Sequence, residues 1–330
     1  MIIHLKQGIQ QVAQIAEELQ AIVINDQDKT ILVNSSSVKE LPSKFDDLVD
    51  EVFVFSSDIQ LADIAYTTGK RSVQIGENQI GGNTGNTLMV AGPCSVESIE
   101  QVEQTAELLN ELNLSCLRAG SYKPRTSPYS FQGMGEDGLK ILRKVCDDNK
   151  FSLFSEVRDA THVNEIIEYS DVVQIGAKAM YSQGILRACA KTQKPVLLKR
   201  GFGTTLQEFV QAAEFILSGG NMNVILCERG IRTFETKTRF TLDLCGVAHL
   251  KEYTNLPIIL DPSHAIGYAY GVPDLARACF AMGIDGLLIE VHPNPKVAKS
   301  DASQQLNHNE FKDLYNSLKP LASALNRKLI

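Results

Sequence analysis

The sequence lacks several features that mark particular classes of protein. It has no tryptophan, no Cys-x-x-Cys pair and no block of like charges, and its net charge is -7. No run approaches the ~18 consecutive apolar residues of a membrane span, and the opening MIIHLKQGIQQ has neither the apolar stretch nor the cleavage site of a signal peptide. We therefore expect a cytoplasmic protein that binds neither nucleic acid nor a membrane.

The seven cysteines are odd in number and scattered along the chain. This pattern argues against a disulfide framework or a zinc ribbon and predicts reduced thiols. Most of them stand in apolar runs, where a free cysteine behaves as a small hydrophobic residue. Cys94 is the exception and belongs with the candidate site residues below.

From about residue 88 the chain alternates short β-rich runs with longer amphipathic stretches, as in repeated βαβ units. The fold class is therefore α/β. Eight strands favour a closed (β/α)8 TIM barrel, with an open doubly wound sheet as the alternative. The strands are expected near 88–93, 115–119, 151–156, 172–176, 195–199, 223–227, 257–261 and 286–291.

The first 70 residues have a different order of elements, βαββαβ, with the second helix near 42–50. This order predicts a small α+β ferredoxin-like domain over 1–70, which by analogy serves regulation or oligomerisation. Residues 71–87 are glycine-rich and predict a linker with a short hairpin closing the bottom of the barrel. The catalytic barrel would then occupy 88–330.

Reactive groups in such a barrel stand just after the strands, on one face. The expected strand ends carry many charged or metal-ligating residues, which predicts an active site at that rim. They are Cys94, Arg118, Lys123, Arg125, Glu156, Lys178, Lys199, Arg200, Glu228, Arg229, Arg232, Asp261, His264, Glu290 and His292.

Two subsets of these residues suggest chemistry. The cations could bind two phosphates, or a phosphate and a carboxylate, although each alone could be a salt-bridged strand end; they are Arg118, Lys123, Arg125, Lys178, Lys199 and Arg229. The second subset suits one divalent ion of the type Mn²⁺, Fe²⁺, Co²⁺ or Zn²⁺, with a packed thiol among hydrogen-bonded polar groups as the alternative. It consists of Cys94, His264, Glu290 and Asp301.

Common nucleotide and hydrolase motifs are missing. GFGTT at 201–205 is glycine-rich but completes neither a Walker loop nor a GxGxxG fingerprint, and GxSxG, HExxH and kinase signatures are absent. A turn in a barrel loop explains the segment.

Seven segments of the barrel together carry a resemblance to a known family. They are GPCSVES (92–98), LRAGSYKPRTSPYSFQG (117–133), QIGAK (174–178), PVLLKRG (195–201), ILCERGIRTFE (225–235), DPSHA (261–265) and EVHPNPKVAKSD (290–301). Through these segments the chain resembles the 3-deoxy-D-arabino-heptulosonate 7-phosphate (DAHP) synthase family, in the subgroup close to 3-deoxy-D-manno-octulosonate 8-phosphate (KDO8P) synthase. The resemblance implies metal-dependent condensation of phosphoenolpyruvate with erythrose 4-phosphate and water, the first step toward chorismate and the aromatic amino acids.

The resemblance also implies roles for individual residues. Lys123, Glu156 and His264 would be catalytic, with Lys123 as proton donor to the departing phosphate. Arg125 and Thr126 would grip the phosphate of the aldose. Phosphoenolpyruvate would be held by Arg118, Lys123, Lys199 and Arg229, with Lys178 also meeting its phosphate, and the metal by Cys94, His264, Glu290 and Asp301.

The chain departs from the family pattern at two places. Lys178 stands where the family commonly has arginine, and lysine keeps the charge but loses the bidentate fork. After the metal histidine, Gly267 is followed by Tyr268, Ala269 and Tyr270 instead of a GRRD-like segment. We expect the first departure to alter phosphate affinity, and the second to alter the contacts of the loop and a contact between subunits.

The sequence argues against two rival functions. KDO8P synthase, which uses arabinose 5-phosphate, typically has a KANRS-like stretch where this chain has KPRTSP at 123–128. A barrel that only senses aromatic amino acids would not need every metal and phosphate position filled. The resemblance further implies a homotetramer and feedback inhibition by Phe or Tyr at the N-terminal domain, a domain that could equally serve only to support the oligomer.

Overall fold

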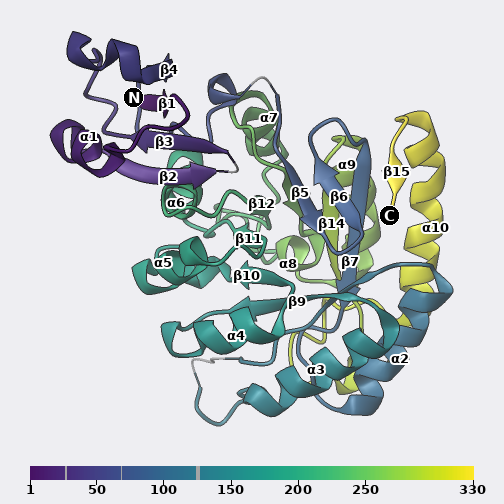
Figure 1. The fold of residues 1–330 in the computed structure, drawn as a ribbon. Helices are drawn as coiled ribbons and strands as arrows, with labels where there is room; N and C mark the ends of the chain where they lie inside the picture. The colour runs from purple at the N-terminus through teal and green to yellow at the C-terminus, as the bar shows by residue number, and fades with distance from the viewer. Residues whose placement is uncertain (27, 68, 124–126) are drawn as a thin grey trace.

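Eight parallel strands form a closed barrel in the computed structural model, which describes residues 1–330 except 27, 68 and 124–126 (Figure 1). Each strand pairs with the next, and β14 pairs with β7 from Gly286↔Leu88 to Glu290↔Gly92, which closes the ring. The barrel prediction is confirmed and the open sheet is wrong. The strands are β7 (Asn86–Gly92), β8 (Cys116–Arg118), β9 (Ser152–Val157), β10 (Val172–Ile175), β11 (Val196–Lys199), β12 (Val224–Glu228), β13 (Ile258–Leu260) and β14 (Gly286–Glu290).

Helices surround the barrel, and side chains cap the first turn of four of the outer helices. The Ser98 hydroxyl accepts the N–H of Gln101, and Thr205 with Glu208 forms a capping box that satisfies two helix-terminal donors. The short α8 (Pro262–Ile266) is an extra helix directly after β13. The outer helices are α2 (Ile99–Glu111), α3 (Gly135–Asn149), α4 (Val163–Tyr169), α5 (Gln183–Lys191), α6 (Leu206–Ser218), α7 (Leu244–Tyr253), α9 (Val272–Ala281) and α10 (His308–Ala324).

A hairpin of β5 (Ser72–Ile75) and β6 (Asn78–Gly81) closes the amino-terminal end of the barrel. Val73, Ile75 and Ile80 belong to the same buried cluster as the side chains inside the barrel. Because this end is filled by apolar side chains, the opposite end is left for chemistry. The hairpin lies in the predicted linker, and β7 begins two residues before the expected start at 88. The final strand β15 (Lys328–Leu329) pairs with the first two residues of β7.

The N-terminal segment forms a four-stranded antiparallel sheet in the order β2-β3-β1-β4. Its strands are β1 (Ile2–Leu5), β2 (Ile22–Asp26), β3 (Lys29–Val33) and β4 (Val49–Phe53), with α1 (Val12–Leu19) between the first two. This arrangement is compatible with the expected ferredoxin-like domain. The second helix differs from the prediction: Ser43–Leu48 is a 3₁₀ segment, the tighter helix that proteins use in short pieces between other elements.

Hydrogen bonds from two side chains of the barrel domain hold the backbone of the segment after this sheet. The buried Glu214 carboxylate on α6 accepts the N–H groups of Leu61 and Ala62 at 2.7 and 2.9 Å. The Asn255 amide donates to the carbonyls of Leu61 and Asp63, both at 2.9 Å. Residues 61–63 are therefore held against α6 and the residues that follow α7. Among the described residues, no helix is long and apolar enough to cross a membrane.

Candidate active site

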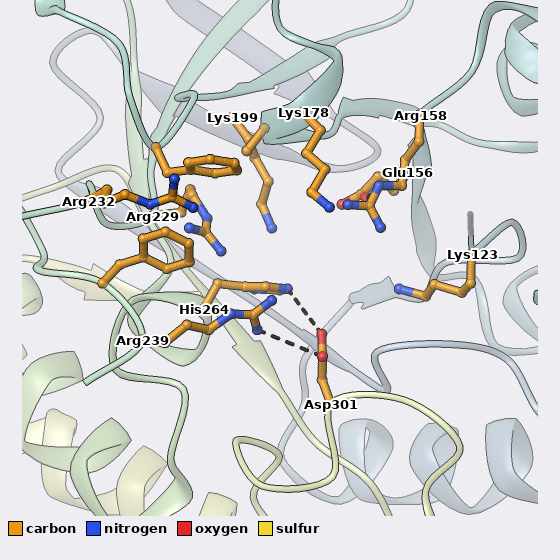
Figure 2. Close-up of a pocket in the computed structure, with 13 residues that line it drawn as sticks. Lys123, Glu156, Arg158, Lys178, Lys199, Arg229, Arg232, Arg239, His264 and Asp301 are labelled. Carbon is orange, nitrogen blue, oxygen red and sulfur yellow. Dashed lines mark ion pairs between the residues drawn. The ribbon is translucent and has the colours of Figure 1, made fainter. Parts of the chain in front are cut away.

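A polar cavity of about 290 Å³ lies at the carboxyl ends of the barrel strands (Figure 2). Seven of its lining residues are Lys or Arg, and two are carboxylates. This excess of positive charge in a partly enclosed space suits a ligand with more than one anionic group. The charged lining consists of Lys123, Glu156, Arg158, Lys178, Lys199, Arg229, Arg232, Arg239 and Asp301, with His264 beside them.

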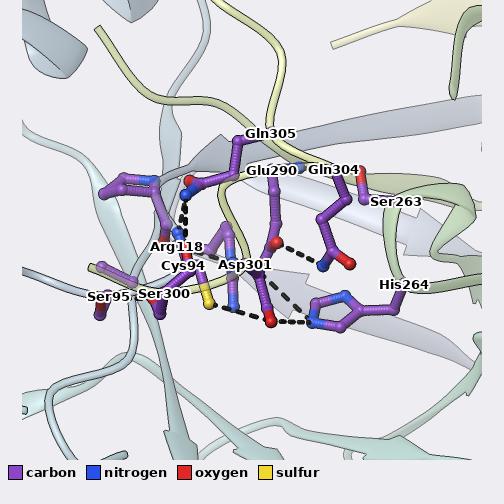
Figure 3. A network of polar contacts seen from close by, with 12 residues as sticks. Cys94, Ser95, Arg118, Ser263, His264, Glu290, Ser300, Asp301, Gln304 and Gln305 are labelled. Carbon is purple, nitrogen blue, oxygen red and sulfur yellow. Dashed lines mark hydrogen bonds and ion pairs between the residues drawn. The ribbon is translucent and has the colours of Figure 1, made fainter. Parts of the chain in front are cut away.

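The four residues expected to hold a metal converge at one side of this cavity (Figure 3). Ligand atoms of Cys94, Glu290 and Asp301 all lie within 4.8 Å of one another, and the Cys94 Sγ to Asp301 Oδ2 distance is 3.3 Å. The His264 Nε2 atom lies 3.3 Å from Glu290 Oε1 and 4.0 Å from Asp301 Oδ2. One sulfur, one imidazole nitrogen and two carboxylates therefore share a site from β7, α8, β14 and the following loop.

The imidazole of His264 is oriented by Asp261 at the end of β13. Its Nδ1 lies 2.7 Å from Asp261 Oδ2, so the proton on Nδ1 is directed to the carboxylate and Nε2 faces the other ligands. Burial lowers the pKa of His264, even though the neighbouring carboxylates oppose the shift. A neutral imidazole with Nε2 turned inward is the form that can bind a metal ion.

Further polar contacts hold the remaining ligands. Gln304 Nε2 donates to Glu290 Oε2 at 2.6 Å, while Gln304 Oε1 accepts from Arg239 Nη1 at 2.7 Å. The neighbouring Gln305 Oε1 accepts the Cys94 backbone N–H at 2.9 Å. The loop after β14 thus fixes both a carboxylate of the site and the backbone that carries the thiol.

Burial raises the pKa of the Cys94 thiol to about 12, and Glu290 adds to the shift. Lys123 is the nearest compensating charge, with its Nζ 3.2 Å from Cys94 Sγ. A thiolate in this place needs positive charge at close range, and a divalent cation supplies more of it than one ammonium group. The donor set therefore fits a borderline transition metal.

Two of the predicted cations line the cavity, and a third lies behind its wall. Lys199, almost fully buried, lines the cavity and places its Nζ 2.7 Å from Asp261 Oδ2. Arg229 lines the cavity too, with its guanidinium over the Phe240 ring at 4.3 Å. Arg118 does not line it: the buried guanidinium lies behind the wall, 2.5 Å from Glu290 Oε1.

Lys178 reaches the cavity from the segment after β10. Lys123 enters from the loop after β8, over Gly120, where a Cβ would stand 2.9 Å from Lys123 Cε. Arg125 and Thr126 lie outside the described residues.

Glu156 is a carboxylate held on two sides. Its Oε2 accepts from Gln174 Nε2 at 2.5 Å, and its Oε1 lies 3.0 Å from Arg158 Nε. Burial alone would raise the pKa of Glu156, but Arg158, Lys199 and other nearby cations lower it well below its ordinary value. The group is therefore ionised at neutral pH and acts as a hydrogen-bond acceptor rather than an acid.

Sequence reasoning did not assign several residues that the structure places in or around the site. Asp261 and Arg232 stood at expected strand ends, so their position was a usable signal. Arg158 follows Glu156 by two residues, and alternation along a strand puts such residues on one side. Arg239 and Gln304 lie in irregular loops and had no sequence signal.

Comparison with known proteins identifies what this chain is similar to. The family model described as the DAHP synthetase I family matches residues 67–327. The chain is 40% identical to the phospho-2-dehydro-3-deoxyheptonate aldolase of Thermotoga maritima, over 100% of both chains. It is also 30% identical to a 2-dehydro-3-deoxyphosphooctonate aldolase of Hydrogenovibrio crunogenus, covering 73% of this chain and 92% of the relative.

Solved structures agree with the sequence comparison. The crystal structure of the Thermotoga maritima phospho-2-dehydro-3-deoxyheptonate aldolase (DAHP synthase) matches with a TM-score of 0.81 at 38% identity, over 100% of this chain and 99% of the other. A truncated form of the DAHP synthase from the same organism matches with a TM-score of 0.78 at 39% identity, over 83% of this chain and 100% of the other.

Proposed function

Because the chain belongs to the DAHP synthetase I family and is an enzyme of the DAHP synthase type, we propose that it condenses phosphoenolpyruvate with erythrose 4-phosphate and water. The products are DAHP and phosphate, in the first step of the shikimate pathway to the aromatic amino acids. The observation that supports this most is the contact between a cavity with seven cationic side chains and a cluster of metal-type ligands. Free thiols at all seven cysteines suit a reducing cytoplasm.

Cys94, His264, Glu290 and Asp301 would hold one divalent ion, Mn²⁺, Fe²⁺, Co²⁺ or Zn²⁺. When bound, such an ion supplies Lewis acidity toward the aldehyde oxygen of the aldose. The chain itself orients the imidazole through Asp261 and the Glu290 carboxylate through Gln304. These two contacts keep the ligand atoms aimed at one point in the absence of an ion.

The cationic side chains would bind phosphoenolpyruvate. Lys199 and Arg229 are buried in the wall and can neutralise its carboxylate and phosphate without moving far. Lys178 adds a positive charge from the end of the neighbouring strand β10. Arg118 is engaged with Glu290, so its part in binding requires an exchange of partners. Fixed positive charge in a partly buried cavity stabilises an anion whose charge redistributes during reaction.

Lys123 and Glu156 would handle protons and water. Lys123 is held near the cavity by its contact with Cys94 and can donate a proton to the departing phosphate as the C–O bond breaks. Glu156, ionised and fixed by Gln174, can accept a hydrogen bond from the water that adds to C2. Arg125 and Thr126, outside the described residues, would take the aldose phosphate.

Phosphate release from phosphoenolpyruvate tests this proposal. Metal-stripped protein is assayed with erythrose 4-phosphate or arabinose 5-phosphate, before and after Mn²⁺ is added. Metal-dependent turnover with erythrose 4-phosphate alone supports the proposal. Preference for arabinose 5-phosphate would instead support KDO8P synthase, the second candidate, whose curated members reach 30–32% identity. Absence of turnover with both sugars under every divalent ion would reject the catalytic assignment.

The N-terminal sheet would bind Phe or Tyr as a feedback inhibitor, within a homotetramer. The family resemblance supports this proposal. So do the hydrogen bonds of Glu214 and Asn255 to the segment that follows the sheet, since binding at the sheet could act on the barrel through these two side chains. Removal of 1–70 should abolish inhibition of turnover by these amino acids. Unchanged sensitivity would reject the regulatory role, and the mass of the intact protein by light scattering tests the tetramer.

A further inference from the structure

Arg158 reaches into the cavity from a position that no function above requires. It follows β9 directly, and its side chain turns across the end of β10 toward Lys178 (Figure 2). Its Nε lies 3.0 Å from Glu156 Oε1, and 22% of the side chain is exposed. The guanidinium is therefore held at its inner end while its outer end faces the cavity.

The path of this side chain depends on Gly176 at the end of β10. A Cβ at that position would lie 2.9 Å from Glu156 Oε1 and 3.3 Å from Arg158 Cγ. The backbone of Gly176 is extended, with φ -63° and ψ 148°, so its conformation does not require glycine. The missing side chain instead provides the space in which the Glu156–Arg158 pair lies against the strand end.

The outer nitrogens of Arg158 have no protein partner within the described part of the chain. Only its Nε is paired, with Glu156. By contrast, Arg200 engages Nη1 with Glu228 and Asp243 and Nη2 with the carbonyl of Thr204. Arg158 thus presents two parallel N–H donors toward the cavity, in the geometry that matches two oxygens of one phosphate.

We propose that Arg158 binds the phosphate group of a phosphorylated substrate together with Lys178, supplying the bidentate fork that Lys178 lacks. The inference rests on the proposed function, because it assigns a residue to the same phosphate-binding cavity. A lysine contributes one compact charge, whereas a guanidinium fixed through Nε contributes charge and orientation. The two side chains come from adjacent strand ends and would share one phosphate monoester.

Binding and turnover of Arg158 variants test the proposal. Phosphoenolpyruvate is titrated calorimetrically into metal-free wild-type protein and into Arg158→Gln, Arg158→Lys and the control Arg187→Gln, which removes an exposed guanidinium from α5. Loss of two charge-assisted hydrogen bonds should weaken binding by Arg158→Gln about 10- to 100-fold. Arg158→Lys should fall between Gln and wild type, and Arg187→Gln should bind as wild type does.

A compensating change separates direct binding from an effect through Glu156. If the two cations share one phosphate, Lys178→Arg in the Arg158→Gln background should recover most of the lost affinity. In steady-state assays, Arg158→Gln should raise KM for phosphoenolpyruvate more than it lowers kcat. A fall in kcat with unchanged Kd and KM would overturn the proposal and leave Arg158 as a positioning residue for Glu156.

The binding measurement also distinguishes this inference from the proposed function. Wild-type protein that binds phosphoenolpyruvate through Arg158 but turns over neither sugar would reject the reaction and retain the inference. Normal turnover with erythrose 4-phosphate and no effect of Arg158→Gln on Kd or KM would reject the inference alone. Failure of the wild type to bind phosphoenolpyruvate would reject both. Circular dichroism and thermal unfolding check that each variant is folded. If Arg158→Gln is not folded, Arg158→Lys takes its place in the comparison with wild type.

Discussion

Asp261→Asn should lower the stability of the metal-free protein and weaken binding of a divalent ion at the proposed metal site. Asp261 is fully buried and satisfies three donors with two oxygens. Its Oδ2 lies 2.7 Å from both Lys199 Nζ and His264 Nδ1, and its Oδ1 accepts the backbone N–H of His264 at 3.0 Å. The carboxylate therefore joins Lys199, a cation of the cavity, to His264, a residue of the proposed metal site.

The size of the effect follows from this geometry. Asparagine has one acceptor oxygen, so either the two side-chain donors or the backbone donor must face an NH₂ group. A buried donor that lacks an acceptor lowers the free energy of unfolding by about 1–3 kcal/mol. Because the Lys199 ammonium also loses its counter-charge, we expect a total loss of about 3–5 kcal/mol. Because His264 loses its orienting partner, metal affinity should also fall about 10- to 100-fold.

Urea unfolding of metal-free protein and titration with Mn²⁺ measure the two effects. Asp274→Asn is a matched control, since Asp274 is 82% exposed and pairs only with Arg277 among the described residues; it should change stability by less than about 0.5 kcal/mol. If Asp261→Asn loses no more stability than this control and binds Mn²⁺ as wild type does, the reasoning is refuted. Lost stability with unchanged Mn²⁺ affinity would limit Asp261 to a structural role.

Three further predictions use other parts of the molecule. Gly176→Ala places a Cβ against the Glu156 carboxylate, so kcat should fall about tenfold or more while the unfolding free energy changes by less than about 2 kcal/mol. Of the seven cysteines, only Cys245 is exposed, so a thiol reagent should modify one group in the native protein and seven after unfolding; a count of five in denaturant would indicate a disulfide. Burial lowers the pKa of His4 below 6.5, although Glu51 opposes the shift. The stabilisation from neutral His4 should thus be present above pH 6.5 and be lost as pH falls through the lowered pKa; hydrogen exchange of β1 measures it, and His4→Gln should remove the pH dependence.

The barrel was predictable because its signals are local and repeated. All eight expected strands appear within about two residues of their predicted ends, since each buried strand is a short apolar run bounded by turn residues. Closure followed from the count of strands. The 3₁₀ segment Ser43–Leu48 shows where this reasoning fails: its composition permits a helix but does not distinguish a 3₁₀ segment from an α-helix.

The site was predictable to the extent that strand ends meet at one rim. That rule brought together Cys94, His264 and Glu290 from three strand ends. It could not find Arg239 or Gln304, whose positions depend on the course of two loops and on a hydrogen bond between residues 65 positions apart. Such contacts leave no periodic trace in the sequence, so supporting residues are harder to predict than the groups they support.

The two subsets of residues, treated separately at the level of sequence, are interlocked in the structure. Arg118 pairs with Glu290, Lys123 contacts Cys94, and Lys199 pairs with Asp261, which orients His264. Cations of the first subset therefore balance negative charge in and beside the second. A change in one subset must alter the other. Removing the Glu290 carboxylate, for example, would leave Arg118 without its partner and change the charge available to a bound phosphate. Since coupling free energies are reciprocal, loss of a cation should likewise alter how tightly the ligand cluster holds a divalent ion, and mutational effects in this site should not add.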